Sequence, residues 1–178
     1  MNLRRYLRPF RGLLLRFRLR SLKRAGLQIG DDCIMGTLGG FPEFGSEPYL
    51  VSIGNHVGFG QGVVFVTHDG GTFVINRDAP YKDVIKYGRI IVHDNTFLGQ
   101  NVVLMPGAEV GPNSVVAAGA IVSRATPPNS VIAGAPARAV MSIEEYARQC
   151  LVSTPEYDKV AYRRDKRAEI LRLFPRPW

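Results

Sequence analysis

The chain is poor in cysteine and has no long apolar run. Its 178 residues include two cysteines, Cys33 and Cys150, and one tryptophan. Two distant cysteines do not make the framework of a small disulfide-stapled secreted domain, so free thiols in a reducing compartment are the simpler interpretation. No segment approaches the ~18 apolar residues of a membrane-spanning helix. The run Leu13–Leu15 is followed directly by arginine, which is untypical of a secretory signal. We therefore expect a cytoplasmic protein.

Acidic residues are absent before Asp31. Nine of the 23 basic residues lie within the first 24 positions, and the rest of the chain holds 14 basic and 15 acidic residues. The net charge of +8 therefore belongs to the amino-terminal segment. Apolar residues recur there at three- and four-residue steps, which predicts a basic amphipathic helix; they are Leu3, Leu7, Phe10, Leu14 and Phe17.

Three interpretations of residues 1–24 remain open. The segment could lie on an anionic membrane surface, which would hold the protein peripherally at the inner membrane. It could instead pack against the rest of the chain or against a neighbouring subunit. Nucleic-acid binding is the third, and we do not expect it, because no recognition motif is present and few aromatic residues interleave with the basic ones.

A period of six residues dominates the middle of the chain. Six aliphatic residues share one phase: Val92, Leu98, Leu104, Val110, Val116 and Val122. Small or slim residues recur at the fourth place after each: Thr96, Val102, Ala108, Ser114, Ala120 and Thr126. This period fits neither a helix nor a single strand, but three short strands per turn of a parallel β-helix require it. An antiparallel sheet with evenly spaced turns is the alternative, although such sheets favour longer spacings.

The same phase recurs upstream with two interruptions. Ile53, Phe59 and Phe65 are six apart, and Ile29 and Met35 form an earlier pair. The breaks run over residues 37–50 and 69–89, and loops expelled from uniform coils are natural walls for a ligand cleft.

The carboxyl end leaves the repeat. Ser142–Glu145 is typical of a capping box that opens a helix, and Thr154-Pro155 is typical of the start of a second helix that ends near Phe174. We therefore expect three parts: a basic amphipathic segment over 1–26, an all-β solenoid over 27–141 and a helical tail over 142–178.

Five sequence blocks carry a family resemblance. They are Val66–Gly71 (VTHDGG), Phe97–Asn101 (FLGQN), Leu104–Gly107 (LMPG), Ala117–Val122 (AAGAIV) and Gly134–Arg138 (GAPAR). Residues 27–141 resemble the hexapeptide-repeat acyltransferases. Within that superfamily they are most similar to the maltose/galactoside acetyltransferase type, in the branch of polysaccharide O-acetyltransferases. Val92-His93 and Val116-Ala117 depart from the usual Ile-Gly pairs without breaking the core phase.

The resemblance implies a left-handed parallel β-helix, a homotrimer with active sites between neighbouring solenoids, and acetyl-CoA as donor without a metal. Matched to the family motif, five residues would bind the donor: Gln100, Ala118, Ser123, Arg124 and Arg138. Arg138 would lie near the nucleotide phosphates, because a guanidinium can bind two phosphate oxygens at once.

His68 is the expected general base. An alcohol needs a base to remove its proton during acyl transfer, and histidine titrates near working pH. His68 ends a predicted strand at the mouth of the second loop, in the family's catalytic place, whereas His56 and His93 lack that context. Asp69 is the expected orienting carboxylate. We expect direct transfer in a ternary complex, because no serine or cysteine has a visible histidine partner.

The expected acceptor is a sugar, nucleotide-sugar or glycan hydroxyl. Aromatic and basic residues of the two loops are candidate acceptor contacts: Phe41, Phe44, Tyr49, Phe73, Tyr81 and Lys82. N-acetylation of an amino sugar or nucleotide-sugar needs the same base and stays open. A zinc hydratase like the γ-carbonic anhydrases fits less well, because the three histidines lack the close pairing of metal ligands. A non-catalytic solenoid scaffold is the remaining alternative.

Overall fold

The computed structural model describes residues 8–35, 41–77 and 79–176. By its internal packing the chain divides into two compact units, residues 1–143 and 144–178. The first unit contains all the strands, and the second contains most of the carboxyl-terminal helices.

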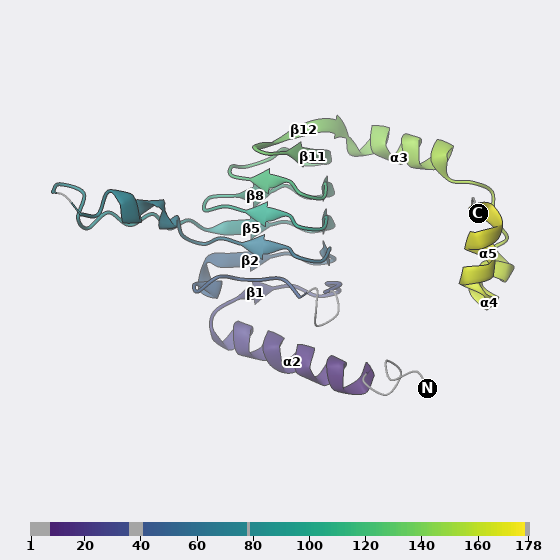
Figure 1. Ribbon diagram of the computed structural model, residues 1–178, viewed down its shortest axis with the longest axis horizontal. Helices are drawn as coiled ribbons and strands as arrows, with labels where there is room; N and C mark the ends of the chain where they lie inside the picture. Colours follow the sequence, from purple (N-terminus) through teal and green to yellow (C-terminus); the bar gives the residue numbers. More distant parts are fainter. Residues whose placement is uncertain (1–7, 36–40, 78, 177–178) are drawn as a thin grey trace. The chain divides into compact units, whose positions relative to one another are not determined.

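The strands of the first unit form stacked coils with three faces (Figure 1). From β2 to β10, successive strands enter three different sheets in turn, and strands of neighbouring coils pair with each other. The first sheet contains β1 (Gln28–Ile29), β2 (Val51–Ile53), β5 (Ile90–Val92) and β8 (Glu109–Val110). The second contains β3 (Gly58–Phe59), β6 (Thr96–Leu98), β9 (Ser114–Val116), β11 (Ser130–Gly134) and β12 (Ala137–Ser142). The third contains β4 (Val64–Phe65), β7 (Val103–Leu104) and β10 (Ile121–Val122).

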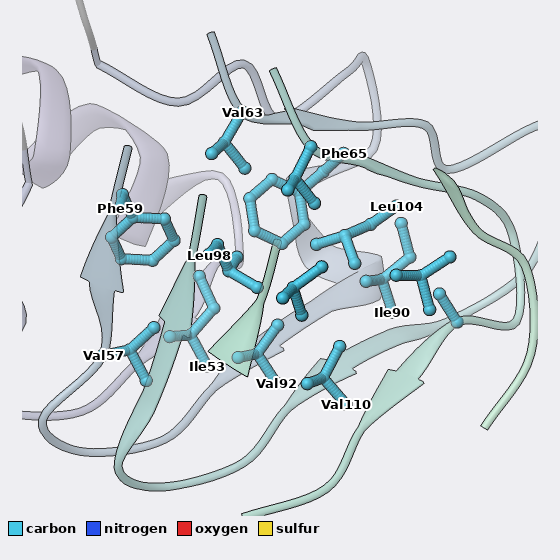
Figure 2. Close-up of a cluster of buried hydrophobic side chains, with 14 of the residues drawn as sticks. Ile53, Val57, Phe59, Val63, Phe65, Ile90, Val92, Leu98, Leu104 and Val110 are labelled. Carbon is cyan, nitrogen blue, oxygen red and sulfur yellow. The ribbon is translucent and has the colours of Figure 1, made fainter. Parts of the chain in front are cut away.

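All of these pairs are parallel except β11 with β12, which close the stack as an antiparallel hairpin. The predicted period of six is confirmed in the core, because every residue of the main phase from Val92 to Val122 is at most 1% exposed. Figure 2 shows four of these side chains, from all three sheets, pointing into the interior of the stack: Val92, Leu98, Leu104 and Val110. Parallel pairing repeats each side chain directly above its equivalent in the previous coil, so one aliphatic position per strand is enough to build a continuous core.

One corner of the stack needs a left-handed backbone in every coil. Five residues with φ between 53° and 55° occupy it: Asp32, His56, Asn95, Asn113 and Asn129. Asparagine tolerates this conformation well. The Asn95 amide donates to Asn113 at 2.9 Å, and the Asn113 amide donates to Asn129 at 3.0 Å. These bonds tie successive coils together. His56 occupies the equivalent position in the coil before Asn95.

Helix α2 (Arg8–Arg24) closes the amino-terminal end of the stack (Figure 1). Leu15, Leu19 and Leu22 pack against the core. The helix ends at Gly26, where φ is +98° and the Leu27 amide donates to the Leu22 carbonyl at 3.0 Å. Of the predicted apolar stripe, Leu14 and Phe17 instead face outward, while the side chains of Leu3, Leu7 and Phe10 lie outside the described residues.

The two predicted insertions differ in how they pack. Residues 41–50 lie against the coils and end in a short 3₁₀ helix, η2 (Pro48–Leu50). Residues 69–89 project away from the coils as an arm that begins with η3 (Gly70–Val74), and the stack resumes at β5 (Figure 1).

The carboxyl-terminal helices are α3 (Ile143–Ser153), α4 (Lys159–Arg164) and α5 (Lys166–Leu173). The expected start at Thr154-Pro155 is wrong. Asp158 caps α4 by accepting from the Val160 and Ala161 amides, and Asp165 caps α5. Among the described helices, none combines the length and apolar character needed to cross a bilayer.

Candidate active site

His68 lies where the arm leaves the third sheet. It is the third residue after β4 and pairs with Tyr87 across the base of the arm. Two backbone bonds close this base: the Asp69 amide donates to Lys86 at 2.9 Å, and the Gly88 amide donates to Thr67 at 3.1 Å. The His68 ring lies 5.6 Å from the Tyr87 ring, between centroids, and its side chain is 46% exposed. The imidazole is therefore both anchored and accessible from solvent.

A buried carboxylate holds the inner nitrogen of His68. Nδ1 of His68 lies 3.0 Å from Oε2 of Glu47, which is buried. The hydroxyl of Thr67, itself buried, donates to the same oxygen at 2.5 Å. The Thr67 bond is the main cause that lowers the pKa of Glu47, and bonds from Ser46 and His68 add to it against the opposing effect of burial. Glu47 therefore stays ionised beside the imidazole at neutral pH.

The first insertion delivers this carboxylate by packing into the core. The Phe44 ring stacks on Phe65 at 4.9 Å, and the Glu43 backbone bonds to both Val63 and Phe65 of the third sheet. Gly45 then turns with φ +62°. A Cβ at Gly45 would lie 2.9 Å from the Thr67 hydroxyl oxygen, so only glycine lets the chain pass this close. This turn brings the Glu47 carboxylate within hydrogen-bonding distance of the His68 ring.

Asp69 does not contact the imidazole. Its carboxylate accepts from the Gly71 amide at 2.9 Å and pairs with Nζ of Lys86 at 2.6 Å, which is the main cause that lowers its pKa. Neighbours in an extended chain point to opposite sides, and Asp69 has extended backbone angles. The expected orienting position is thus filled by Glu47, and Asp69 fastens the base of the arm.

The predicted acceptor contacts fall into two groups. Phe41 and Phe44 are buried in the core, only 6% and 4% exposed, so the expectation that they line an open cleft is wrong. The Arg18 guanidinium lies over the Phe41 ring, which joins this insertion to α2. The remaining candidates are exposed: Tyr49, Phe73, Tyr81 and Lys82.

The predicted donor-binding residues occupy two corners and the final hairpin. Gln100 and Ala118 lie one coil apart at the corner before the third sheet, where the Gly119 amide donates to the Gln100 carbonyl. Ser123 and Arg124 follow β10, which stacks on β7 and β4, so they lie at the same corner as His68, two coils further on. All four are exposed. Within one chain the third sheet separates the two corners, so the structure does not bring these residues together.

Arg138 lies on β12, directly after the turn of the final hairpin. It is exposed and donates to the Ala137 carbonyl at 2.7 Å. The GAPAR block that contains it therefore forms the end of the stack rather than part of a coil.

A second histidine–carboxylate pair lies away from this corner. Nε2 of His93, which follows β5, lies 2.7 Å from Oε1 of Glu109 on β8. Across residues 8–35, 41–77 and 79–176, no three histidine, cysteine or acidic side chains gather as a metal-binding group.

Sequence and structure comparisons agree with this architecture. Residues 89–124 match the model of the bacterial transferase hexapeptide (six repeats) family. Protein CapG of Staphylococcus aureus is 37% identical over 146 residues, which cover 82% of this chain and 83% of CapG. The chain belongs to the hexapeptide-repeat transferase family. It is therefore an enzyme.

Named relatives of this transferase carry out acetyl transfer. A galactoside O-acetyltransferase of Lactococcus lactis is 30% identical over 132 residues, which cover 65% of this chain and 62% of the relative. A hexapeptide-repeat acetyltransferase of Vibrio cholerae, solved with acetyl-CoA, is 26% identical with a TM-score of 0.53. That alignment covers 66% of this chain and 60% of the solved one. The chain thus spans less than two thirds of these two relatives.

Proposed function

We propose that the protein transfers an acetyl group from acetyl-CoA to a hydroxyl of a sugar or polysaccharide precursor. The observation that carries this proposal is the half-exposed His68 imidazole held by the buried, ionised Glu47. The proposal also includes the left-handed sense of the β-helix, which its family membership supports.

His68 acts as the general base. With the Nδ1 proton bonded to Glu47, the outer nitrogen Nε2 carries the lone pair and accepts the proton of the acceptor hydroxyl. The alkoxide oxygen forms a bond to the thioester carbon, and the tetrahedral intermediate then breaks its carbon–sulfur bond. The imidazolium returns the proton to the departing thiolate. Glu47 stabilises the imidazolium between these two steps.

The donor site requires a second copy of the chain. Gln100 and Ala118 lie at one corner of the coils, and Ser123 and Arg124 lie at another. A neighbouring solenoid in a homotrimer would bring its own Gln100–Ala118 corner beside the His68 corner of the first. The extended pantetheine chain would then lie between two subunits, with Arg124 and Arg138 available to its phosphates.

The acceptor lies against the arm and the first insertion. Tyr49, Phe73 and Tyr81 expose aromatic faces, and sugars pack their apolar C–H faces on such rings. Lys82 adds a cation for a phosphate or an acidic sugar. The galactoside O-acetyltransferase activity named for a relative supports a sugar hydroxyl as the nucleophile. We place the enzyme in the cytoplasm, where acetyl-CoA is available, and at the inner face of a membrane.

An acetyl-transfer screen with two histidine variants tests this function. Sugars, amino sugars, nucleotide-sugars and lipid-linked oligosaccharides are incubated with acetyl-CoA, and the products are identified by mass spectrometry. His68→Ala should lower kcat by about 10²–10⁴-fold, the usual contribution of a general base, with acetyl-CoA affinity unchanged. His93→Ala is the matched control, because it removes the other paired imidazole. Equal activity of His68→Ala and wild type would refute the base assignment, and exclusive acetylation of amines would establish N-acetylation instead.

A further inference from the structure

Helix α2 carries two apolar faces, and only one is used by the fold. Leu15, Leu19 and Leu22 contact the core. Leu13, Leu14 and Phe17 are 52%, 54% and 57% exposed. At 100° per residue, Phe17 lies beside Leu13 and Leu14 and faces away from the core contacts. A helix that only closes the end of the stack would need a single apolar stripe.

Two basic residues flank the exposed apolar group. Arg20 and Arg24 are exposed and lie beside Leu13 and Phe17 on the helix. Arg16 and Lys23 instead line the groove between α2 and the first coil, together with Asp31 and Asp32. Within the described part of the chain, neither Arg20 nor Arg24 forms an ion pair. We define the outer face of α2 as Leu13, Leu14 and Phe17 with Arg20 and Arg24.

We propose that the outer face of α2 binds the surface of an anionic phospholipid bilayer. Leu13, Leu14 and Phe17 enter the boundary between headgroups and acyl chains, and the basic residues contact lipid phosphates. The charge favours this occupant over a second copy of the chain, because two such faces would repel each other. Since α2 lies across the amino-terminal end of the stack, the coils project away from the bilayer (Figure 1).

Vesicle co-sedimentation of the full chain tests this inference. Wild type should bind vesicles made of equal parts phosphatidylglycerol and phosphatidylcholine, and this binding should weaken as the salt concentration rises. It should not bind vesicles of pure phosphatidylcholine. The double variant R20Q/R24Q should bind on the order of 10-fold more weakly, given the usual contribution of each basic residue near a charged surface. The variant L13S/L14S/F17S should lose on the order of 10-fold or more in affinity.

Two control variants lie in the second unit. R163Q/R164Q removes the same charge from α4, and L151S/V152S removes two highly exposed apolar side chains from α3. Both should bind vesicles like wild type. Thermal unfolding monitors folding of each variant, and light scattering monitors its oligomeric state.

Two results would overturn the proposal. In the first, the α2 variants fold and bind vesicles as well as their controls. In the second, L13S/L14S/F17S changes the oligomeric mass but leaves vesicle binding unchanged, which would make the outer face a subunit contact.

Discussion

The His68–Glu47 and His93–Glu109 pairs have similar nitrogen–oxygen distances but differ in how deeply the carboxylate is buried. The separation is 3.0 Å in His68–Glu47 and 2.7 Å in His93–Glu109, and the histidine side chains are 46% and 41% exposed. The carboxylates differ more: the Glu47 side chain is 11% exposed and the Glu109 side chain 45%. The Thr67 hydroxyl donates a hydrogen bond to the Glu47 carboxylate, and His68 is held by its backbone pairing with Tyr87 at the base of the arm. The shorter contact is therefore not the better candidate for catalysis, because an exposed pair is free to rearrange.

The largest effect should come from removing the charge of Glu47, compared with removing the charge of Glu109. Glu47→Gln should lower kcat by about 10²-fold or more, because an amide can hold the wrong imidazole tautomer and cannot stabilise the imidazolium. Glu109→Gln should leave kcat unchanged. Steady-state acetyl transfer measures both, and similar losses in the two variants would mean that the settings of the pairs do not matter.

A smaller effect should follow from removing the bond behind Glu47. Thr67→Val should lower kcat by about 10-fold, since one charge-assisted hydrogen bond to the carboxylate is lost. That bond is the main cause of the lowered Glu47 pKa, so the pKa should rise toward its ordinary value of 4.5. Glu47 is needed ionised, and its contribution is lost as the pH falls through its folded pKa. In this variant, activity should therefore fall more steeply than in wild type at the acid end of the pH–rate profile.

Thr96→Val is the control for this positioning role. Thr96 is equally buried but bonds to backbone carbonyls at a different corner. It should change stability without shifting the pH–rate profile. An unshifted profile in Thr67→Val would leave Thr67 with a packing role alone.

The smallest effect should appear in stability, on comparing two glycines with positive φ. Gly45→Ala and Gly107→Ala both force a side chain into the left-handed region, which costs about 1–2 kcal/mol. Only at Gly45 would the new Cβ meet a neighbour, the Thr67 hydroxyl, because nothing lies within 4 Å of the one at Gly107. Denaturant unfolding should show a larger loss for Gly45→Ala, and kcat should fall in that variant alone. Equal losses would mean that the first insertion adapts around Thr67.

The core residues and the position of His68 could be predicted from the sequence, because both depend on the spacing of nearby residues. One aliphatic residue per strand, repeated every six residues, is enough to predict the coils, and all six residues of the main phase are buried. His68 stands out because the repeat breaks directly after it. The predicted phase also recovers Ile53, Phe59 and Phe65, despite the long arm that follows them.

Glu47 could not be identified in the same way. It reaches His68 from 21 residues away, through an insertion that pairs with β4 but has no period. Asp69 was the nearer carboxylate in the sequence, but the alternation of an extended chain turns it toward Lys86. Phe41 and Phe44 were assigned to the surface because they lie in an insertion, yet their rings fill the core. For α2, the residue spacing identified an apolar stripe, of which the two residues with described side chains, Leu14 and Phe17, are exposed.

The coil that carries His68 determines its height above the closed end of the stack. His68 belongs to the second coil above α2, and coils are spaced by the ~4.8 Å separation of paired strands, which puts the imidazole on the order of 10 Å from the end. On an enzyme that rests on a bilayer with this end, as proposed above, the coil that carries His68 would set how far from the bilayer an acceptor hydroxyl must lie. One added coil beneath His68 would increase that distance by about 5 Å.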